Sequence, residues 1–234
     1  MSALFSSLSL GPLALANRIV AASAGTIAAD NYAGAAFNFS TAGLTAASLG
    51  AVGTVNYVGT YTPNGTTYRL GGGGGTLNYG VAIAGAGNSL AVSGPGTVGL
   101  ALANSYGNGT TVSGGTLLLS APATLGSTAG ALAVSGGTLD LGATSQTVGA
   151  VTISGGTVQN GNLTGTSYSI TGGTITASLT GAGVITATGN PTILNSNNSG
   201  FSGAINVTSN TLRAIDPRSL GSGIVTLSSG TTLN

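Results

Sequence analysis

The stretch TTVSGGTLLLS, residues 110–120, decides the fold, because close variants of it recur along the chain. LAVSGGTLDLG, VTISGGTVQNG and YSITGGTITAS follow at residues 132–142, 151–161 and 168–178. Each variant has alternating apolar residues beside a glycine pair, a pattern typical of β-strands with one buried face. Glycine adopts positive φ without steric cost, so each pair, Gly136 included, is predicted to form a corner between strands. The predicted structural turns are Gly114, Gly115, Gly136, Gly137, Gly155, Gly156, Gly172 and Gly173.

The threonine after each glycine turn marks the repeat. The nine markers are Thr76, Thr97, Thr116, Thr138, Thr157, Thr174, Thr192, Thr211 and Thr232. The first and the last lie 156 residues apart, which gives eight intervals of about 19.5 residues. The residue after the marker is apolar in all nine repeats. A period of about 20 residues indicates a solenoid and is too short for a four-stranded propeller blade.

One repeat cannot cover its own apolar face, so neighbouring repeats must stack on each other. The sequence therefore predicts an all-β fold, a right-handed parallel β-helix with rungs of about 20 residues. Val112, Leu117 and Leu119 are expected to point inward, and the rungs to stack at about 4.8 Å. Three segments are predicted. Residues 1–25 form a leader or N-terminal cap, residues 26–70 form less regular rungs, and residues 71–234 form regular repeats of which the last is incomplete.

The composition excludes several function classes. The 43 glycines disfavour helices, and the absence of cysteine excludes disulfides and thiolate chemistry. Polar residues interrupt the apolar runs long before the roughly 18 residues of a spanning helix, so no direct membrane insertion is expected. A net charge of +1 cannot attract nucleic acid. The formal charges are Arg18, Arg69, Arg213, Arg218, Asp30, Asp140 and Asp216.

No catalytic, metal or cofactor site is predicted. Asp140 and Asp216 are 76 residues apart, about four rungs or roughly 19 Å, too far for paired catalytic acids. Asp140 is expected to point outward, and Asp216 to form a turn with a weak ion pair to Arg218. The stretch 94–99 matches G-x-G-x-x-G, but no helical pattern follows it, and the glycine run 71–75 lacks the lysine of a phosphate-binding loop.

Four tyrosines near the first clear repeat have two possible roles. Tyr57, Tyr61, Tyr68 and Tyr79 either form a platform for a sugar or a protein partner, or fill the core and cap the open end of the solenoid. Capping is favoured, because a solenoid needs an end that protects its apolar interior.

Residues 104–142, NSYGNGTTVSGGTLLLSAPATLGSTAGALAVSGGTLDLG, resemble the passenger-associated repeat of bacterial autotransporters. YRLGGGGGTLNY at residues 68–79 and NNSGFSGAINVTSNTLRA at residues 197–214 are similar to phrases of the same proteins. The resemblance covers residues 55–234 and implies a β-helical passenger that is secreted or held at the bacterial outer membrane. It also implies export through the outer-membrane barrel of a longer parent protein, of which this chain is then a fragment. Glycans or host-cell surface components are the implied partners.

The N-terminal residues resemble a second protein family over a shorter stretch. LFSSLSLGPLALANRIV, residues 4–20, is similar to the opening of the old yellow enzyme family of flavin oxidoreductases. The histidine pair of that family cannot exist in a chain without histidine, so no flavin site is transferred. Ala14 and Ala16 form an A-x-A pattern, but no basic residue precedes it as a signal peptide requires.

The sequence favours a non-catalytic adhesin or structural stalk. One alternative is a threonine-array binder of ice or ordered glycans, suggested by Thr174-Ile175-Thr176 and Thr186-Ala187-Thr188. The other alternative is a polysaccharide-degrading β-helix enzyme, although the chain has no His, Cys, Lys or Glu for proton transfer near neutral pH.

Overall fold

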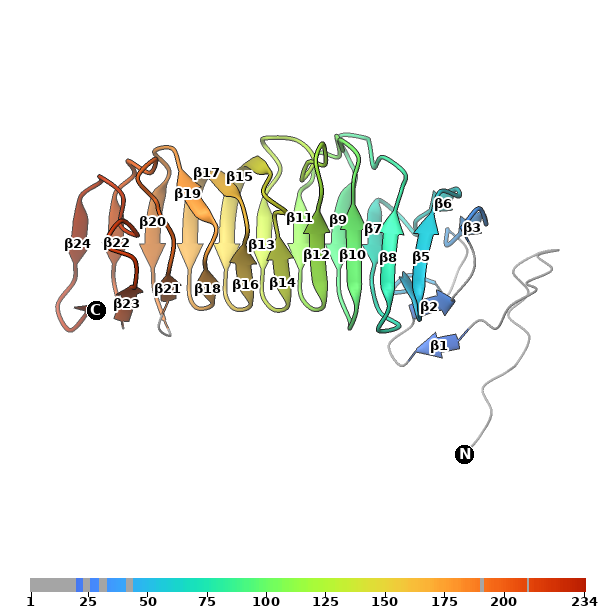
Figure 1. Cartoon of the computed structure of the whole chain (residues 1–234), viewed down its shortest axis with the longest axis horizontal. Helices are drawn as coiled ribbons and strands as arrows, with labels where there is room; N and C mark the ends of the chain where they lie inside the picture. Colours follow the sequence, from blue (N-terminus) through green and yellow to red (C-terminus); the bar gives the residue numbers. More distant parts are fainter. Residues whose placement is uncertain (1–19, 23–25, 30–32, 41–43, 190–191, 210) are drawn as a thin grey trace, which may run out of the picture.

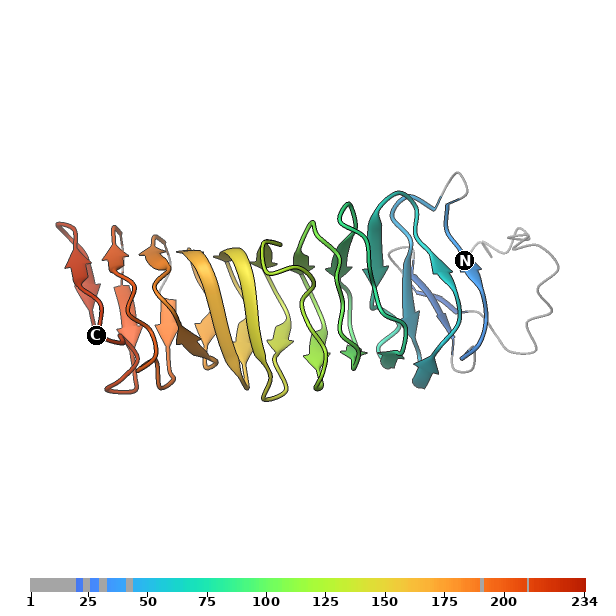
Figure 2. The same ribbon diagram turned by 90° about the horizontal axis from the view of Figure 1, so that it is seen from above.

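The computed structural model describes residues 20–22, 26–29, 33–40, 44–189, 192–209 and 211–234. The chain winds into a parallel β-solenoid of about 10 turns, with its first and last described strands at opposite ends of a long stack (Figure 1). Figure 2, seen from above, shows the same progression from the N-terminal to the C-terminal rungs. The similarity to flavin enzymes at residues 4–20 and the A-x-A pattern fall almost entirely outside the described residues.

Two long sheets carry the solenoid, and a third of two strands lies near its N-terminal end. The first sheet has the order β1 Val20–Ala22, β2 Thr26–Ala29, β4 Ser48–Ala51, β7 Thr67–Leu70, β9 Ser89–Val92, β11 Thr110–Val112, β13 Leu132–Val134, β15 Ser145–Ile153, β17 Asn162–Ile170, β20 Val184–Ala187, β22 Ile205–Val207 and β24 Val225–Leu227, and β19 Ser178–Thr180 also pairs with β17. The second sheet consists of β5 Thr54–Tyr57, β8 Thr76–Tyr79, β10 Thr97–Leu100, β12 Thr116–Leu119, β14 Thr138–Asp140, β16 Thr157–Gln159, β18 Thr174–Ile175, β21 Thr192–Leu194, β23 Thr211–Ala214 and β25 Thr232–Leu233. The third sheet pairs β3 Phe37–Asn38 with β6 Tyr61–Thr62.

The predicted fold class is confirmed. The described residues contain no helix, and their strand pairs are parallel except for β1 with β2. Apart from β3 and β6, the strands before residue 71 belong to the same two sheets as the regular repeats, since β5 pairs with β8 and β7 with β9. Within the described part of the chain, no helix is long and apolar enough to cross a bilayer.

The core consists of aliphatic columns that run from rung to rung. Along the first sheet one column pairs successive strands at Leu70, Val92, Val112, Val134, Ile153, Ile170, Ala187 and Val207. Along the second sheet the facing column is Val55, Leu77, Val98, Leu117, Leu139, Val158, Ile175 and Leu194. None of these side chains is more than 3% exposed, and burying each valine, leucine or isoleucine stabilises the fold by roughly 1.5–3 kcal/mol. Val112, Leu117 and Leu119 point inward as predicted.

The glycine corners need both residues of each pair, but for different reasons. Positive φ occurs at the second glycine, Gly115, Gly137, Gly156 and Gly173, so the positive φ predicted for Gly136 is wrong. A Cβ on Gly137 would lie 2.4 Å from Gly115 O of the preceding rung. A Cβ on Gly136 would still lie 2.7 Å from Ser113 O. At this corner the first glycine is therefore required by close packing between rungs, and the second by its φ as well.

The marker Thr192 is out of register with its neighbours. Ile193, rather than Thr192, pairs with Thr174, and Leu194 continues the inner column from Ile175. Thr192 consequently points inward and is 1% exposed. A shift of one residue exchanges the two faces of a strand, and here it places Leu194 in the core. The rule that an apolar core residue follows each marker fails at this rung.

Buried amides complete the connecting segments between the two sheets. Asn104, Gln146 and Asn198 are 7%, 4% and 0% exposed. The amide oxygens of these residues accept hydrogen bonds from the backbone N–H groups of Ile83, Leu125 and Leu179, at 2.9, 2.9 and 2.7 Å. The amide nitrogens of Asn104 and Asn198 donate to backbone oxygens of the following rung, and that of Gln146 donates to the preceding rung. These side chains satisfy backbone groups that have no strand partner.

Candidate binding surface

The outer face of the second sheet carries a column of hydroxyl groups. Seven threonines pair in register from rung to rung: Thr54, Thr76, Thr97, Thr116, Thr138, Thr157 and Thr174. Thr54 adds a repeat before the first marker found in the sequence. The parallel strands place these hydroxyl groups about 4.8 Å apart along the solenoid axis. The column gives this face a polar surface without charge.

The residues two positions after each threonine form a second, more varied column. From β5 to β16 it consists of Asn56, Asn78, Gly99, Leu118, Asp140 and Gln159. Asn78 Nδ2 donates a hydrogen bond of 2.7 Å to Asn56 Oδ1 across neighbouring rungs. Gly99 interrupts the column, since it has no side chain to stand between Asn78 and Leu118.

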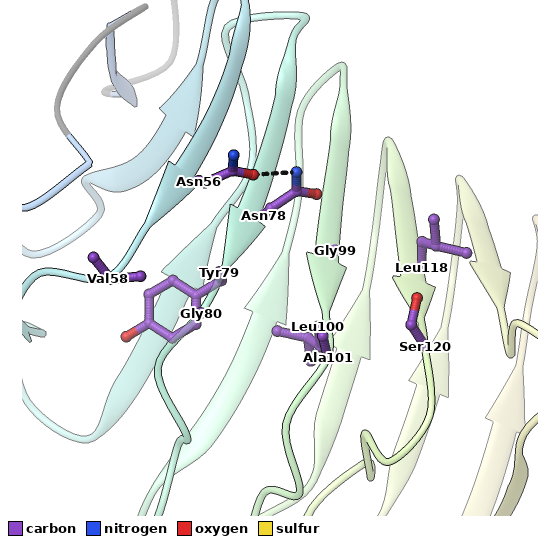
Figure 3. Close-up of a pocket in the computed structure, with 10 residues that line it drawn as sticks. All are labelled: Asn56, Val58, Asn78, Tyr79, Gly80, Gly99, Leu100, Ala101, Leu118 and Ser120. Carbon is purple, nitrogen blue, oxygen red and sulfur yellow. Dashed lines mark hydrogen bonds between the residues drawn. The ribbon is translucent and has the colours of Figure 1, made fainter.

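A groove of about 250 Å³ lies at this interruption. Its lining residues are Asn56, Val58, Asn78, Tyr79, Gly80, Gly99, Leu100, Ala101, Leu118 and Ser120. Figure 3 shows Asn56 and Asn78 joined by their hydrogen bond, with Gly99 on the neighbouring strand, Leu118 on the strand after it and Ser120 just past the end of that strand. None of the lining residues is charged. The groove therefore combines an apolar floor with an amide rim.

Asp140 lies in the same column but is occupied by structural hydrogen bonds. Its Oδ1 accepts from Gly142 N at 2.9 Å, and its Oδ2 accepts from Gln159 Nε2 and Asn160 Nδ2, both at 2.8 Å. Partial burial raises the pKa of this carboxyl, but the hydrogen bonds from Gln159, Gly142 and Asn160 outweigh it and hold the pKa below its ordinary value. Asp140 points outward as predicted and joins β14 to the turn after β16.

We expect this carboxylate to make the stability of the fold sensitive to acid. A carboxyl whose pKa is depressed by folding stabilises the protein above its unfolded pKa of about 4, and the contribution is lost as pH falls through the folded pKa. Asp140→Asn should therefore lower the melting temperature at pH 7 and flatten its decline between about pH 5 and pH 2. Thermal melts across this pH range measure both effects. An unchanged decline would show that Asp140 does not contribute to the acid sensitivity.

Asp216 occupies a turn far along the sequence from the groove. Its Oδ1 accepts hydrogen bonds from Arg218 N at 2.8 Å and Arg218 Nε at 3.2 Å. These hydrogen bonds from Arg218 hold the pKa of Asp216 below its ordinary value. The predicted turn and its surface ion pair are both confirmed.

The four tyrosines do not form a surface platform. Tyr57, Tyr61 and Tyr79 are 0%, 6% and 2% exposed, whereas Tyr68 is half-buried. The ring centroids of Tyr57 and Tyr79 stack at 5.6 Å, and those of Tyr61 and Tyr68 meet edge to face at the same distance. Burial raises the pKa of Tyr57 to about 12, which keeps its hydroxyl as the donor to Ala35 O at 2.9 Å. Tyr57, Tyr61 and Tyr79 are therefore core side chains at the N-terminal end, and Tyr68 packs against them from a half-buried position.

The two T-x-T pairs do not combine into one array. Thr174 lies on β18 of the second sheet, whereas Thr186 lies on β20 of the first sheet and pairs with Ser169 and Asn206. The array expected from these pairs is therefore divided between two faces. The threonine column that does exist comes from the markers themselves.

The sequence reasoning missed the groove residues Asn56, Asn78, Gly99 and Leu118. Their common signal is the second position after the threonine marker, which alternation places outside. A scan against protein-family models and searches of curated proteins and of solved structures found no match to this chain.

Proposed function

We propose that this chain is a non-catalytic display segment, which acts as an adhesin or structural stalk through repeated weak contacts along its side. The observation that carries the proposal is the threonine column, in register over seven rungs on one face. A rigid stack repeats the same outward groups at a fixed spacing. Repeated groups at fixed spacing are suited to a long or multivalent ligand.

The composition supports binding rather than catalysis. The chain has no His, Cys, Lys or Glu, so it lacks the side chains that most often transfer protons or act as nucleophiles near neutral pH. Asp140 accepts hydrogen bonds from its own turn and from the next rung, and Asp216 accepts hydrogen bonds from Arg218 within one turn. A structural role accounts for both of these carboxylates.

The resemblance of residues 104–142 to autotransporter passenger repeats supports a proposal about where the protein is located. We propose a passenger segment, secreted or held at the bacterial outer membrane, that belongs to a longer parent protein with an outer-membrane barrel. The β-solenoid fold is compatible with this assignment. Glycans or host-cell surface components are the proposed partners.

The test measures retention and cleavage of polysaccharides together. We expect the purified chain to be retained on at least one immobilised glycan without release of reducing ends. Beads that carry many copies should attach on the order of 10² times more strongly than beads with isolated copies, because linked weak sites raise the effective concentration. Release of reducing ends that disappears in Asp140→Asn or Asp216→Asn would show an enzyme and overturn the proposal.

The ice-binding alternative remains a second candidate, favoured by the same threonine column. Thermal hysteresis of the purified chain measures it directly. If the chain shows thermal hysteresis and this hysteresis disappears when Thr116 and Thr138 are replaced by valine, ice binding becomes the better-supported function in place of adhesion. We expect the adhesin to show no such effect, because the column beside the threonines changes chemistry from rung to rung.

A further inference from the structure

We propose that the groove at Gly99 is a subsite for one neutral sugar unit of a polysaccharide, with the amides of Asn56 and Asn78 as its polar contacts. This inference rests on the proposed function and names the ligand class of the adhesive face. The juxtaposition that carries it is an apolar hollow directly beside a hydrogen-bonded amide pair.

Small residues on neighbouring rungs create the hollow. Gly80, Gly99 and Ala101 are among its lining residues, and Figure 3 shows the larger side chains of Val58 and Leu118 on opposite sides of them. Its volume of about 250 Å³ lies below the roughly 300–1,000 Å³ of pockets for drug-sized ligands. A space of this size suits a single ring with its substituents.

The amide pair provides hydrogen-bonding groups at the rim of the hollow. Asn78 uses one amide hydrogen for Asn56 Oδ1 and keeps its own Oδ1 beside Gly99, at 2.8 Å from the position that a Cβ would take there. Both asparagines are exposed, and among the described residues no other hydrogen bond engages the Asn78 side chain. The Ser120 hydroxyl lines the groove from another rung. Donors and acceptors thus border the hollow on more than one side.

A pyranose ring matches this arrangement. Its faces present C–H groups that pack on an apolar floor, and its edges present hydroxyl groups that donate to and accept from amides. A purely apolar ligand would cover the asparagine amides without replacing their bonds to water, at a cost in affinity. An ionic ligand would find no opposite charge among the lining residues. A neutral sugar can replace the bonds of the amides to water and needs no opposite charge.

The threonine column extends the subsite along the face. Thr76, Thr97 and Thr116 lie on the same three strands as Asn78, Gly99 and Leu118, two residues earlier in each. A polysaccharide that places one ring in the groove is therefore expected to meet further hydroxyl groups when it runs along the solenoid axis.

Gly99→Val tests the groove without breaking the fold. Gly99 is in an ordinary strand conformation, and the nearest atom to an added Cβ is the flexible end of Asn78, with Asn78 Cα at 3.8 Å. The new side chain should fill the hollow and lower affinity about tenfold or more, whereas Asn78→Ala should lower it about threefold to tenfold. The matched control is Ala133→Val, which adds an apolar side chain at an outward position of the first sheet and should leave affinity unchanged.

The probes are cellohexaose, maltohexaose, xylohexaose and a polygalacturonate oligomer, titrated by isothermal calorimetry into the full chain. We expect one of the neutral oligomers to bind, with an affinity that is insensitive to 1 M salt because no charge pair forms. Circular dichroism and melting curves show whether each variant is folded. If Gly99→Val does not fold, Leu118→Ala takes its place as the variant that changes the shape of the groove.

The outcomes separate this inference from the proposed function. The groove proposal would be overturned if a neutral oligomer binds with an affinity that neither Gly99→Val nor Asn78→Ala changes. It would also be overturned if polygalacturonate alone binds. Either result would leave the proposed adhesin function intact. Coated beads that adhere to cells while no neutral oligomer binds would do the same. Failure of the beads to attach to any glycan or cell would overturn the proposed function itself.

Discussion

Replacing Asn198 by leucine is expected to lower the free energy of unfolding by roughly 2–6 kcal/mol, with about 1–3 kcal/mol for each buried backbone group that loses its partner. The Asn198 side chain is fully buried. Its Oδ1 accepts a hydrogen bond of 2.7 Å from Leu179 N, and its Nδ2 donates one of 2.6 Å to Ser219 O. Leucine has nearly the same size but can make neither hydrogen bond. The rungs on both sides therefore lose a contact that packing cannot replace.

Hydrogen exchange is the appropriate measurement, because each rung of a solenoid contacts only its neighbours and unfolding can be local. Protection should fall in the rungs around residues 175–220 and stay unchanged near residue 100. The control is Asn206→Leu, the same replacement at a half-buried outward position of β22, which should change stability by no more than about 0.5 kcal/mol. Equal losses in both variants would mean that the buried hydrogen bonds of Asn198 contribute nothing.

Four alanine substitutions should separate the two requirements of the glycine corners. Gly87 has space around it and no positive φ, Gly65 has space but φ of 70°, and Gly136 has close backbone contact without positive φ. Gly137 combines φ of 65° with the close contact to Gly115 O. We expect no loss at Gly87, about 1–2 kcal/mol at Gly65 from left-handed strain, and about 1–3 kcal/mol at Gly136 from overpacking.

Gly137→Ala should show the largest loss of the four, close to the sum of these two effects, or about 2–5 kcal/mol. Equilibrium urea unfolding of the four variants measures the differences. A loss at Gly137 no larger than that at Gly65 would show that neighbouring rungs move apart without cost, contrary to the close stacking of the corners.

The candidate surface could be predicted only in part. Alternation after each marker indicates that Asn78, Gly99 and Leu118 point outward, but it does not show that Asn78 bonds Asn56 or that Gly99 leaves a groove. Those features depend on which residues of different rungs lie side by side. The tyrosines illustrate the same limit, because Tyr57 and Tyr79 become core residues through their stacking on each other.

The sequence by itself determined the class of fold, the parallel pairing and the rung length, because glycine corners and period-two alternation act within a few residues. The tertiary structure alone decided that Gly137 rather than Gly136 has positive φ, that Thr192 turns inward and that Asn198 is buried. Each of these depends on the register between rungs, which is selected by the summed packing of both sheets and their connections. Since a shift of one residue exchanges the inner and outer faces, a repeat can predict the solenoid without predicting the surface of every rung.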